Sequence, residues 1–299
     1  MATEELHSMT PALLRRGFGR RDRRVSVIEA RRSDFRSALT ELWRYRAFSF
    51  YFGGRFLRKR YMQTWLGLAW LPLRPTLNVG LKLLVFGGLI GISAGATPYP
   101  VFFLIASAAW QLFSECLSWS TRSLFISRSL LRVVHVPRLV VISGSIVPSL
   151  VDFLIGVGLA AAGLVYYLIR AHIFYLDLTW RSPIYVVGGL GLMALLGIGL
   201  GLIGAVAGSR TRDVRFMLGY VVTFLYYLTP VIYPFQQIPN KYKPIAELNP
   251  LTGAMELFKT GLFRTETVSG NALIVTGIAV VLVWGPGIWL LHRQEVREW

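Results

Sequence analysis

The sequence has only one cysteine, Cys116, among its 299 residues, so it cannot form an intrachain disulfide. It contains no Gly-Lys dipeptide, which excludes the glycine-rich phosphate-binding loop of ATP-hydrolysing domains. It also lacks H-E-x-x-H, D-x-D and any cluster of cysteine and histidine, and its four histidines are scattered. No metal site, bound cofactor or convergent catalytic site is therefore predicted for this chain.

Acidic residues are scarce as well, with 15 Asp and Glu against 32 Lys and Arg and a formal net charge of +17. Such a charge would suit a nucleic-acid partner in a soluble protein. However, 54% of the residues are hydrophobic, 16% are charged and the mean hydropathy is +0.52, which disfavours a soluble domain. We therefore expect an all-α integral membrane protein with a single helical bundle and no nucleic-acid partner.

The apolar segments predict six membrane crossings within a domain of residues 63–299. The crossings are 63–92, 101–121, 139–169, 184–208, 216–233 and 271–291. An even number puts both termini on one side, where 24 Lys and Arg lie, against six on the other. Because cytoplasmic loops carry the excess of positive charge, we expect a bacterial cytoplasmic (inner) membrane protein with both termini in the cytoplasm.

Two basic segments precede the first crossing. Residues 1–34 are polar and arginine-rich, which predicts a cytoplasmic tail, with attraction to anionic membrane lipids as an alternative role. In residues 35–62, Phe48, Phe52 and Phe56 recur at steps of four among Arg and Lys residues. This pattern predicts an amphipathic helix that lies along the membrane interface.

The stretch 222–250 interrupts the fifth crossing. It breaks at Thr229-Pro230 and at Tyr233-Pro234, and then turns polar. Each proline removes a backbone donor and disfavours helical geometry in the residue before it. Broken backbone within a membrane is tolerated where it is buried in protein or lines a wet cavity. The pattern therefore indicates a pore or an outer gate, with Pro230, Tyr233 and Pro234 as its candidate residues.

Polar residues within the crossings are costly there and tend to face cavities or partners. In the first crossing, Arg74, Asn78 and Lys82 recur at i, i+4 and i+8. In the second, a polar face is formed by Ser107, Gln111, Ser114 and Ser118. Both faces are candidates for a translocation path. The alternative is that they hold helices together, with Glu115 and Asp152 as the partners of the two cations.

Two further patterns lie in the fourth and fifth crossings. Tyr220, Phe224 and Tyr227 share one face of the fifth. Aromatic belts and core packing explain most such residues, whereas in a carbohydrate path the ring faces would stack on sugar C–H groups. In the fourth crossing, small residues predict close packing against another helix: Gly197, Gly201, Gly204 and Gly208.

The basic segment 122–138 separates the second and third crossings. Arg128, Arg132 and His135 follow at steps of four and three, opposite an apolar side, and Pro137 is expected to end the helix. A short helix with one cationic and one apolar face suits docking into a groove on a soluble partner.

Four sequence motifs, in the same order on six crossings, resemble one known family. They are RYMQTWLGLAWLPLRP at 60–75, SLLRVVHVPR at 129–138, TRDVRF at 211–216 and LTPVIYPFQQIPNKYKPIAELNPLTG at 228–253. The resemblance is to the permease subunits of type-2 ABC transporters that export cell-surface polysaccharides, the O-antigen and teichoic-acid exporters.

The resemblance implies a homodimer of permeases that encloses a channel for a lipid-linked polysaccharide. Two cytoplasmic ATPase subunits would bind ATP and Mg, so this chain would be a transport subunit and not an enzyme. Leu124–Arg138 would hold the coupling helix, with Arg128, Arg132, His135 and Arg138 at the ATPase contact. Pro234–Arg264 would form re-entrant helices between the fifth and sixth crossings.

Two other functions are compatible with a membrane bundle. One is a membrane-embedded glycosyl- or acyltransferase, which would need a convergent acid–base site that the isolated carboxylates do not provide. The other is a type-2 permease for a small molecule, which would share the fold.

Overall fold

The structure, a computed structural model, describes residues 43–61, 65–95, 97–131, 136–263 and 268–297. The chain separates into the units Met1–Ser33 and Asp34–Trp299, and the described residues all belong to the second. The predicted tail 1–34 and the first part of the predicted interface helix, 35–42, lie outside the described residues. Within the described ranges all regular structure is helical, apart from one isolated bridge between Ala94 and Thr97. The all-α prediction is therefore confirmed.

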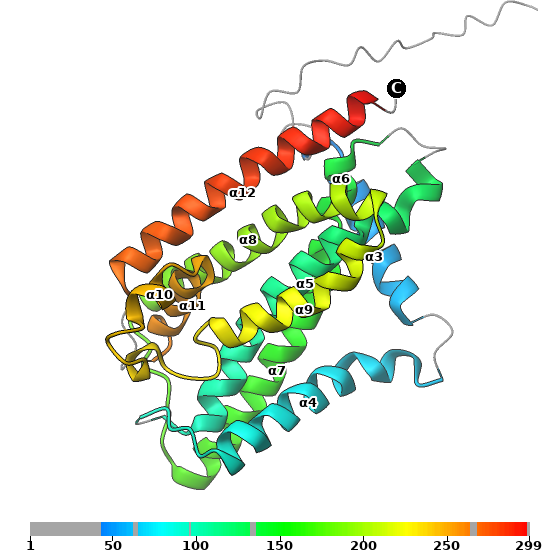
Figure 1. Cartoon of the computed structure of the whole chain (residues 1–299). Coiled ribbons are helices and arrows are strands. Elements are labelled where there is room, and N and C mark those ends of the chain that lie inside the picture. Colours follow the sequence, from blue (N-terminus) through cyan, green and yellow to red (C-terminus); the bar gives the residue numbers. More distant parts are fainter. Residues whose placement is uncertain (1–42, 62–64, 96, 132–135, 264–267, 298–299) are drawn as a thin grey trace, which may run out of the picture. The chain divides into compact units, whose positions relative to one another are not determined.

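Figure 1 shows the helices of this unit, coloured along the chain. Before the central helices come α3 (Arg46–Tyr61), the short η1 (Gly67–Ala69), α4 (Trp70–Leu83) and η2 (Leu84–Leu89). They are followed by α5 (Tyr99–Leu131), α6 (Arg138–Ser143), α7 (Ile146–Ala171), α8 (Ser182–Arg210) and α9 (Asp213–Leu228). The last elements are η3 (Phe235–Gln237), α10 (Lys243–Glu247), α11 (Pro250–Thr260) and α12 (Gly270–Arg297).

Helix α5 is the most buried of the long helices. Its membrane-length window is 78% buried, whereas that of α12 is 11% buried. Helix α5 packs along α7 and α8, and α8 in turn packs against α11 and α12. The core between α5, α8 and α11 consists of aromatic and aliphatic side chains that include Phe102, Phe113, Met193 and Met255. Helix α12, by contrast, has most of its apolar surface uncovered by the described residues.

The glycines of α8 lie at its contact with α5, which confirms their predicted role. A Cβ atom on Gly201 would lie 2.3 Å from Ser120 Cβ, and one on Gly204 would lie 2.5 Å from Thr121 Oγ1. Gly197 is similarly close to α5, with the nearest atom at 2.7 Å. The fourth glycine of the set has more room, 3.4 Å to its nearest neighbour. Three small residues thus let the two backbones approach.

We expect Gly201→Ala to lower the melting temperature of the purified protein, because the added methyl group overpacks the contact by about 1–3 kcal/mol. The matched control is Gly191→Ala on the same helix, where a Cβ atom would meet nothing within 4 Å. Thermal unfolding in detergent measures both variants. Equal melting temperatures would contradict the close packing of α5 and α8.

Four of the described helices are long and apolar enough to cross a membrane: Tyr99–Leu131, Arg138–Ala171, Ser182–Arg210 and Gly270–Gln294. They match the predicted second, third, fourth and sixth crossings. The predicted first crossing is α4, with 14 residues, continued by the six-residue π-helical segment η2. The predicted fifth is α9, with 16 residues, since Pro230 bars Thr229 from helical geometry. By length and composition, four of the described helices are therefore candidates for membrane crossings.

One helix boundary among the described residues differs from the prediction. Helix α5 continues to Leu131 instead of ending near Thr121. Residues 122–131 contain neither glycine nor proline, so charges end the apolar stretch there without ending the helix. Pro137 directly precedes α6 and is its N-cap residue. A proline fits this place because the first amide groups of a helix have no intrahelical partner.

The aromatic face of α3 is covered by protein at Phe52 and Phe56 but not at Phe48, which is 44% exposed. Phe52 and Phe56 are buried, and the Phe56 ring stacks on Trp119 of α5 with 5.9 Å between ring centroids. A Cβ atom on Gly53 would lie 2.4 Å from Val147 Cβ, so α3 also approaches the start of α7 closely. The second half of the predicted interface helix therefore packs against α5 and α7.

Candidate functional site

The polar stripe of the predicted first crossing lies on α4. Arg74 and Asn78 are exposed, and Lys82, one turn further on, is half-buried. The Lys82 ammonium lies 3.7 Å from the centroid of the Tyr226 ring on α9, a cation–π contact. The stripe thus begins on an open face and ends at the contact between α4 and α9.

The polar face of α5 lies behind α4. Ser107 is buried, whereas Gln111, Ser114 and Ser118 are half-buried. The Gln111 amide donates a hydrogen bond to Glu115 Oε1 at 3.3 Å, and Ser114 Oγ donates to the Gln111 carbonyl at 3.1 Å. These two side chains therefore bond within α5. A narrow cleft between α4, α5 and α7 includes both Ser107 and Gln111 in its lining.

The aromatic face of α9 is open. Tyr220 is 80% exposed, Phe224 67% and Tyr227 50%. The Tyr227 ring also lies 6.4 Å from that of Phe86, at the end of the first predicted crossing. Lys82 of α4 contacts Tyr226, and Phe86 of η2 contacts Tyr227, so α4–η2 and α9 are neighbours. The exposed polar face of α4 and the exposed aromatic face of α9 therefore lie on neighbouring helices. Rings that are this exposed do not serve core packing within the described chain.

An ion cluster joins α3, α5 and α7, and sequence reasoning did not find it. Arg60 pairs with Asp152 and, at 3.8 Å, with Glu115. Its guanidinium also lies over the Trp119 ring at 5.8 Å. The exposed fractions of the three charged side chains are 12% for Arg60, 2% for Asp152 and 18% for Glu115. Water therefore screens the cluster only weakly.

The cluster corrects the expected pairing of the two carboxylates. The alternative interpretation of the stripe pairs them with Arg74 and Lys82, but in the described residues both carboxylates form their ion pairs with Arg60. Arg74 adds positive potential at Glu115 and Asp152 from farther away. Arg60 lies on α3, which is far in sequence from both carboxylates but packs at the start of α7. Only the tertiary packing therefore reveals this pairing.

The broken stretch after α9 is fixed by side chains of α11 and of the residue before it. Pro230 and Pro234 are buried, and Tyr233 is half-buried. The Lys259 ammonium donates to the Pro230 carbonyl at 2.9 Å. Asn249 donates through Nδ2 to Thr229 Oγ1, also at 2.9 Å. Sequence reasoning missed both, although the Asn249-Pro250 dipeptide and a lysine in an apolar run were visible signals.

Two of the four coupling candidates are described, one near the end of α5 and one at the start of α6. Arg128 is exposed on the last turns of α5, and Arg138 is the first residue of α6. Arg132 and His135 lie outside the described residues. The Arg215 guanidinium sits 3.7 Å from the ring centroid of Phe125, also near the end of α5, and donates to the Gly208 carbonyl at 3.0 Å. The turn between α8 and α9 is thereby held to the end of α5.

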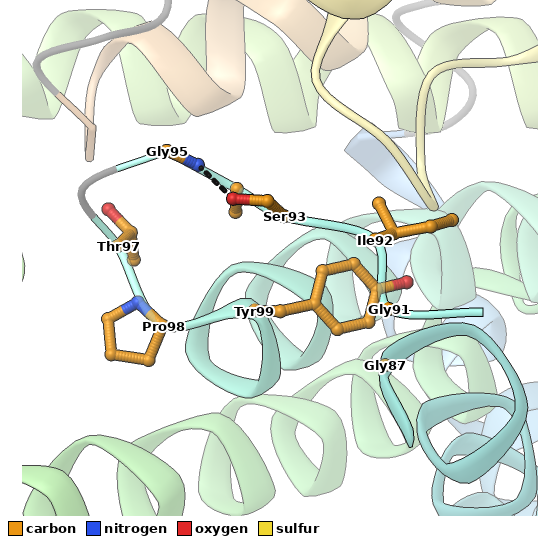
Figure 2. A pocket seen from close by; sticks show the side chains of 9 residues that line it. Gly87, Gly91, Ile92, Ser93, Gly95, Thr97, Pro98 and Tyr99 are labelled. Carbon is orange, nitrogen blue, oxygen red and sulfur yellow. Dashed lines mark hydrogen bonds between the residues drawn. The ribbon is translucent and has the colours of Figure 1, made fainter. Parts of the chain in front are cut away.

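A pocket of about 420 Å³ lies at the opposite end of α5, between η2 and the loop that follows it. Figure 2 shows the Tyr99 ring beside the loop, with Ser93 Oγ accepting a hydrogen bond from the Gly95 amide. Gln237 of the broken stretch donates to the Ser93 carbonyl. The pocket lining contains no ionisable group except the tyrosine, so it offers no acid–base pair.

Comparisons with known proteins bear on this arrangement. The family model described as "ABC-2 type transporter" matches residues 47–263. The O-antigen export system permease protein of Myxococcus xanthus is 24% identical over 262 residues, which cover 86% of this chain and 97% of that protein. That of Klebsiella pneumoniae is 23% identical, with coverages of 81% and 89%. The polysialic acid transport protein of Escherichia coli is 24% identical, with 81% and 91%.

Proposed function

Because the chain belongs to the ABC-2 type transporter family, we propose that it is the permease subunit of an exporter for a lipid-linked cell-surface polysaccharide. The export would run across the bacterial cytoplasmic membrane. The observation that carries the substrate class is the similarity, over at least 81% of the chain, to permeases named for O-antigen export and polysialic acid transport.

The exposed faces of α4 and α9 support a path for a glycan. Arg74 and Asn78 offer a cation and an amide, while Tyr220 and Phe224 offer ring faces. Aromatic rings stack on apolar sugar faces, and cations neutralise the phosphate that links a glycan to its lipid. In this proposal, a second copy of the chain closes the path, so that the transporter contains a homodimer.

The proposed topology has six crossings, with α4–η2 and α9 as two shorter spans beside the four long helices. Both termini are then cytoplasmic, in line with the 24 cationic residues on that side. Between the fifth and sixth crossings, α10 and α11 are proposed as re-entrant helices. In support, Leu251, Ala254 and Met255 of α11 are buried against the bundle, and α11 is too short to span.

ATP hydrolysis is assigned to a separate cytoplasmic ATPase, with ATP and Mg bound there. The end of α5 is the proposed contact, through Arg128, Arg132, His135 and Arg138. Arg128 is exposed, as a docking residue must be.

The purified chain is expected to show no ATPase activity alone, and to support substrate-stimulated hydrolysis when it is purified with its partner ATPase. The physical reason is the missing phosphate-binding loop. The test is phosphate release in detergent or nanodiscs, with Arg128→Glu expected to weaken the stimulation and Lys241→Glu, an exposed cation on the opposite side of the proposed topology, as the control. Hydrolysis by the chain alone would contradict the assignment, and stimulation by a small molecule but by no glycan would favour the small-molecule permease.

A further inference from the structure

Helix α9 buries few of its side chains, although Arg215 near its start contacts Phe125 of α5. Of its 16 residues, only Leu218 and Tyr226 are buried. The residues just beyond it are different, since Thr229 and Val231 are 0% exposed and Ile232 is 2% exposed. The chain thus passes at Thr229-Pro230 from a helix with an open face to a segment enclosed by protein.

Two side chains hold this segment in place. Lys259 bonds the Pro230 carbonyl, and Asn249 bonds the Thr229 hydroxyl, each at 2.9 Å. Asn249 Oδ1 also accepts a hydrogen bond from the Leu251 amide at 3.1 Å, as a helix N-cap does. One amide side chain therefore fixes both the end of α9 and the beginning of α11.

Asn249 and Lys259 lie just before and on α11, and α11 is attached to the helices around it. Thr276 of α12 donates to the Pro250 carbonyl at 2.7 Å. A Cβ atom on Gly253 would lie 2.4 Å from the Ala272 carbonyl oxygen, so α11 and α12 are in close contact. Helix α11 also packs along α8. The bonds to Thr229 and Pro230 thus come from residues at α11, which packs closely on α8 and α12.

Space filling alone does not explain why a lysine, and not an apolar residue, occupies position 259. The residue is 0% exposed, and its ammonium lies 4.9 Å from the centroid of the Phe102 ring. Burying a charge is costly unless it is bonded, and an apolar side chain of the same length would pack without that cost. The charge-assisted bond to the Pro230 carbonyl is a function that such an apolar side chain cannot perform.

We propose that Asn249 and Lys259 are positioning residues for transport. They pin the outer end of α9 to α11, so that α9 tilts about Thr229-Pro230 as a lever while the segment after it stays in place. Movement enters at the other end, where Arg215 connects α9 to the end of α5. The inference rests on the proposed function in that α9 lines the path, but the motion can be measured without knowledge of the glycan.

Distances between spin labels test the pivot in the full permease–ATPase complex with one labelled copy. Cys116 is replaced by serine first. One label pair joins Tyr220→Cys on α9 to Val281→Cys on α12, and the second joins Tyr242→Cys, beyond the break, to Val281→Cys. All three positions are exposed in the described chain, at 80%, 72% and 52% for Tyr220, Val281 and Tyr242. Adding a non-hydrolysable ATP analogue should shift the first distance distribution and leave the second unchanged.

Three variants then test the pin. Lys259→Met should make the second distance distribution broad and nucleotide-dependent, and should abolish substrate stimulation of ATP hydrolysis. Lys259→Arg keeps the cation and should restore both, which a purely space-filling role would not require. Lys241→Met, an exposed cation in the same stretch, is the matched control and should change neither.

The outcomes separate the pivot from the proposed function. If both distances shift together in the parent protein, or if neither shifts while transport proceeds, the pivot is wrong. If Lys259→Met moves like the parent, Lys259 is not the pin. If the lever moves as described but no polysaccharide is carried, the pivot stands and the substrate assignment fails.

Discussion

Replacing Arg60 by methionine is expected to lower the stability of the folded protein more than any other single substitution considered. The change leaves Asp152 and Glu115 without the cation that pairs with both. Removing one partner of a buried ion pair typically costs about 3–5 kcal/mol, since the remaining charge stays desolvated. Because two carboxylates lose the same guanidinium, we expect the loss of folding free energy to lie at the upper end of this range. It should appear as a large fall in melting temperature in detergent.

The matched control is Arg58→Met, an exposed cation on the same helix, which should leave the melting temperature almost unchanged. A second arm neutralises the carboxylates. Arg60→Met combined with Asp152→Asn and Glu115→Gln should recover most of the lost stability, because no unpaired charge then remains. A stable Arg60→Met protein, or no recovery in the triple variant, would show that α3 is held by its aromatic face alone.

Lys82→Met is expected to cause the largest loss of export among variants that still fold. A cation near mid-membrane costs roughly 2.5–3.5 kcal/mol on insertion scales, so its retention requires a reason. The structure removes one candidate reason, because Glu115 and Asp152 pair with Arg60. What remains is the Tyr226 ring at 3.7 Å and the open face of α4. Under the proposed function, a half-buried cation there would bind the anionic linkage of the lipid-linked glycan.

Two control variants separate substrate handling from packing. Lys82→Arg keeps a cation above the ring and should retain export, whereas Tyr226→Phe keeps the ring and should retain stability. Loss of the cation–π contact alone should cost about 0.5–2 kcal/mol, a modest change in melting temperature. Export is measured by polysaccharide at the cell surface, with assembly checked by co-purification of the ATPase. Full export by a stable Lys82→Met protein would rule out a role in the path.

Local sequence patterns predicted those features that depend on one helix at a time. The small residues at steps of three and four in α8 lie on its α5 contact, because helical geometry alone puts them on one face. The three aromatic residues of α9 likewise share an exposed face. The end of α9 at Thr229 followed from the proline after it. Each of these conclusions needed only residues within two or three turns.

The partners of buried charges could not be read from the sequence. Arg60 and Asp152 are 92 positions apart, and Lys259 and Pro230 are 29 apart. Which cation meets which carboxylate depends on how α3 packs onto α7, and helix periodicity carries no information about that. The length of α5 was also misjudged, because hydropathy reports where the apolar face ends and not where the hydrogen-bonded helix ends.

The central claim is that this chain forms an ATP-driven path for a lipid-linked polysaccharide. The most direct measurement is transport by the purified permease–ATPase complex in sealed proteoliposomes, with a labelled lipid-linked glycan added to the leaflet that faces the ATPase. The account predicts ATP-dependent transfer of the label to the opposite side, absent without the permease and strongly reduced in Lys82→Met. Hydrolysis of ATP without any transfer of glycan, in complexes that instead carry a small molecule, would contradict it.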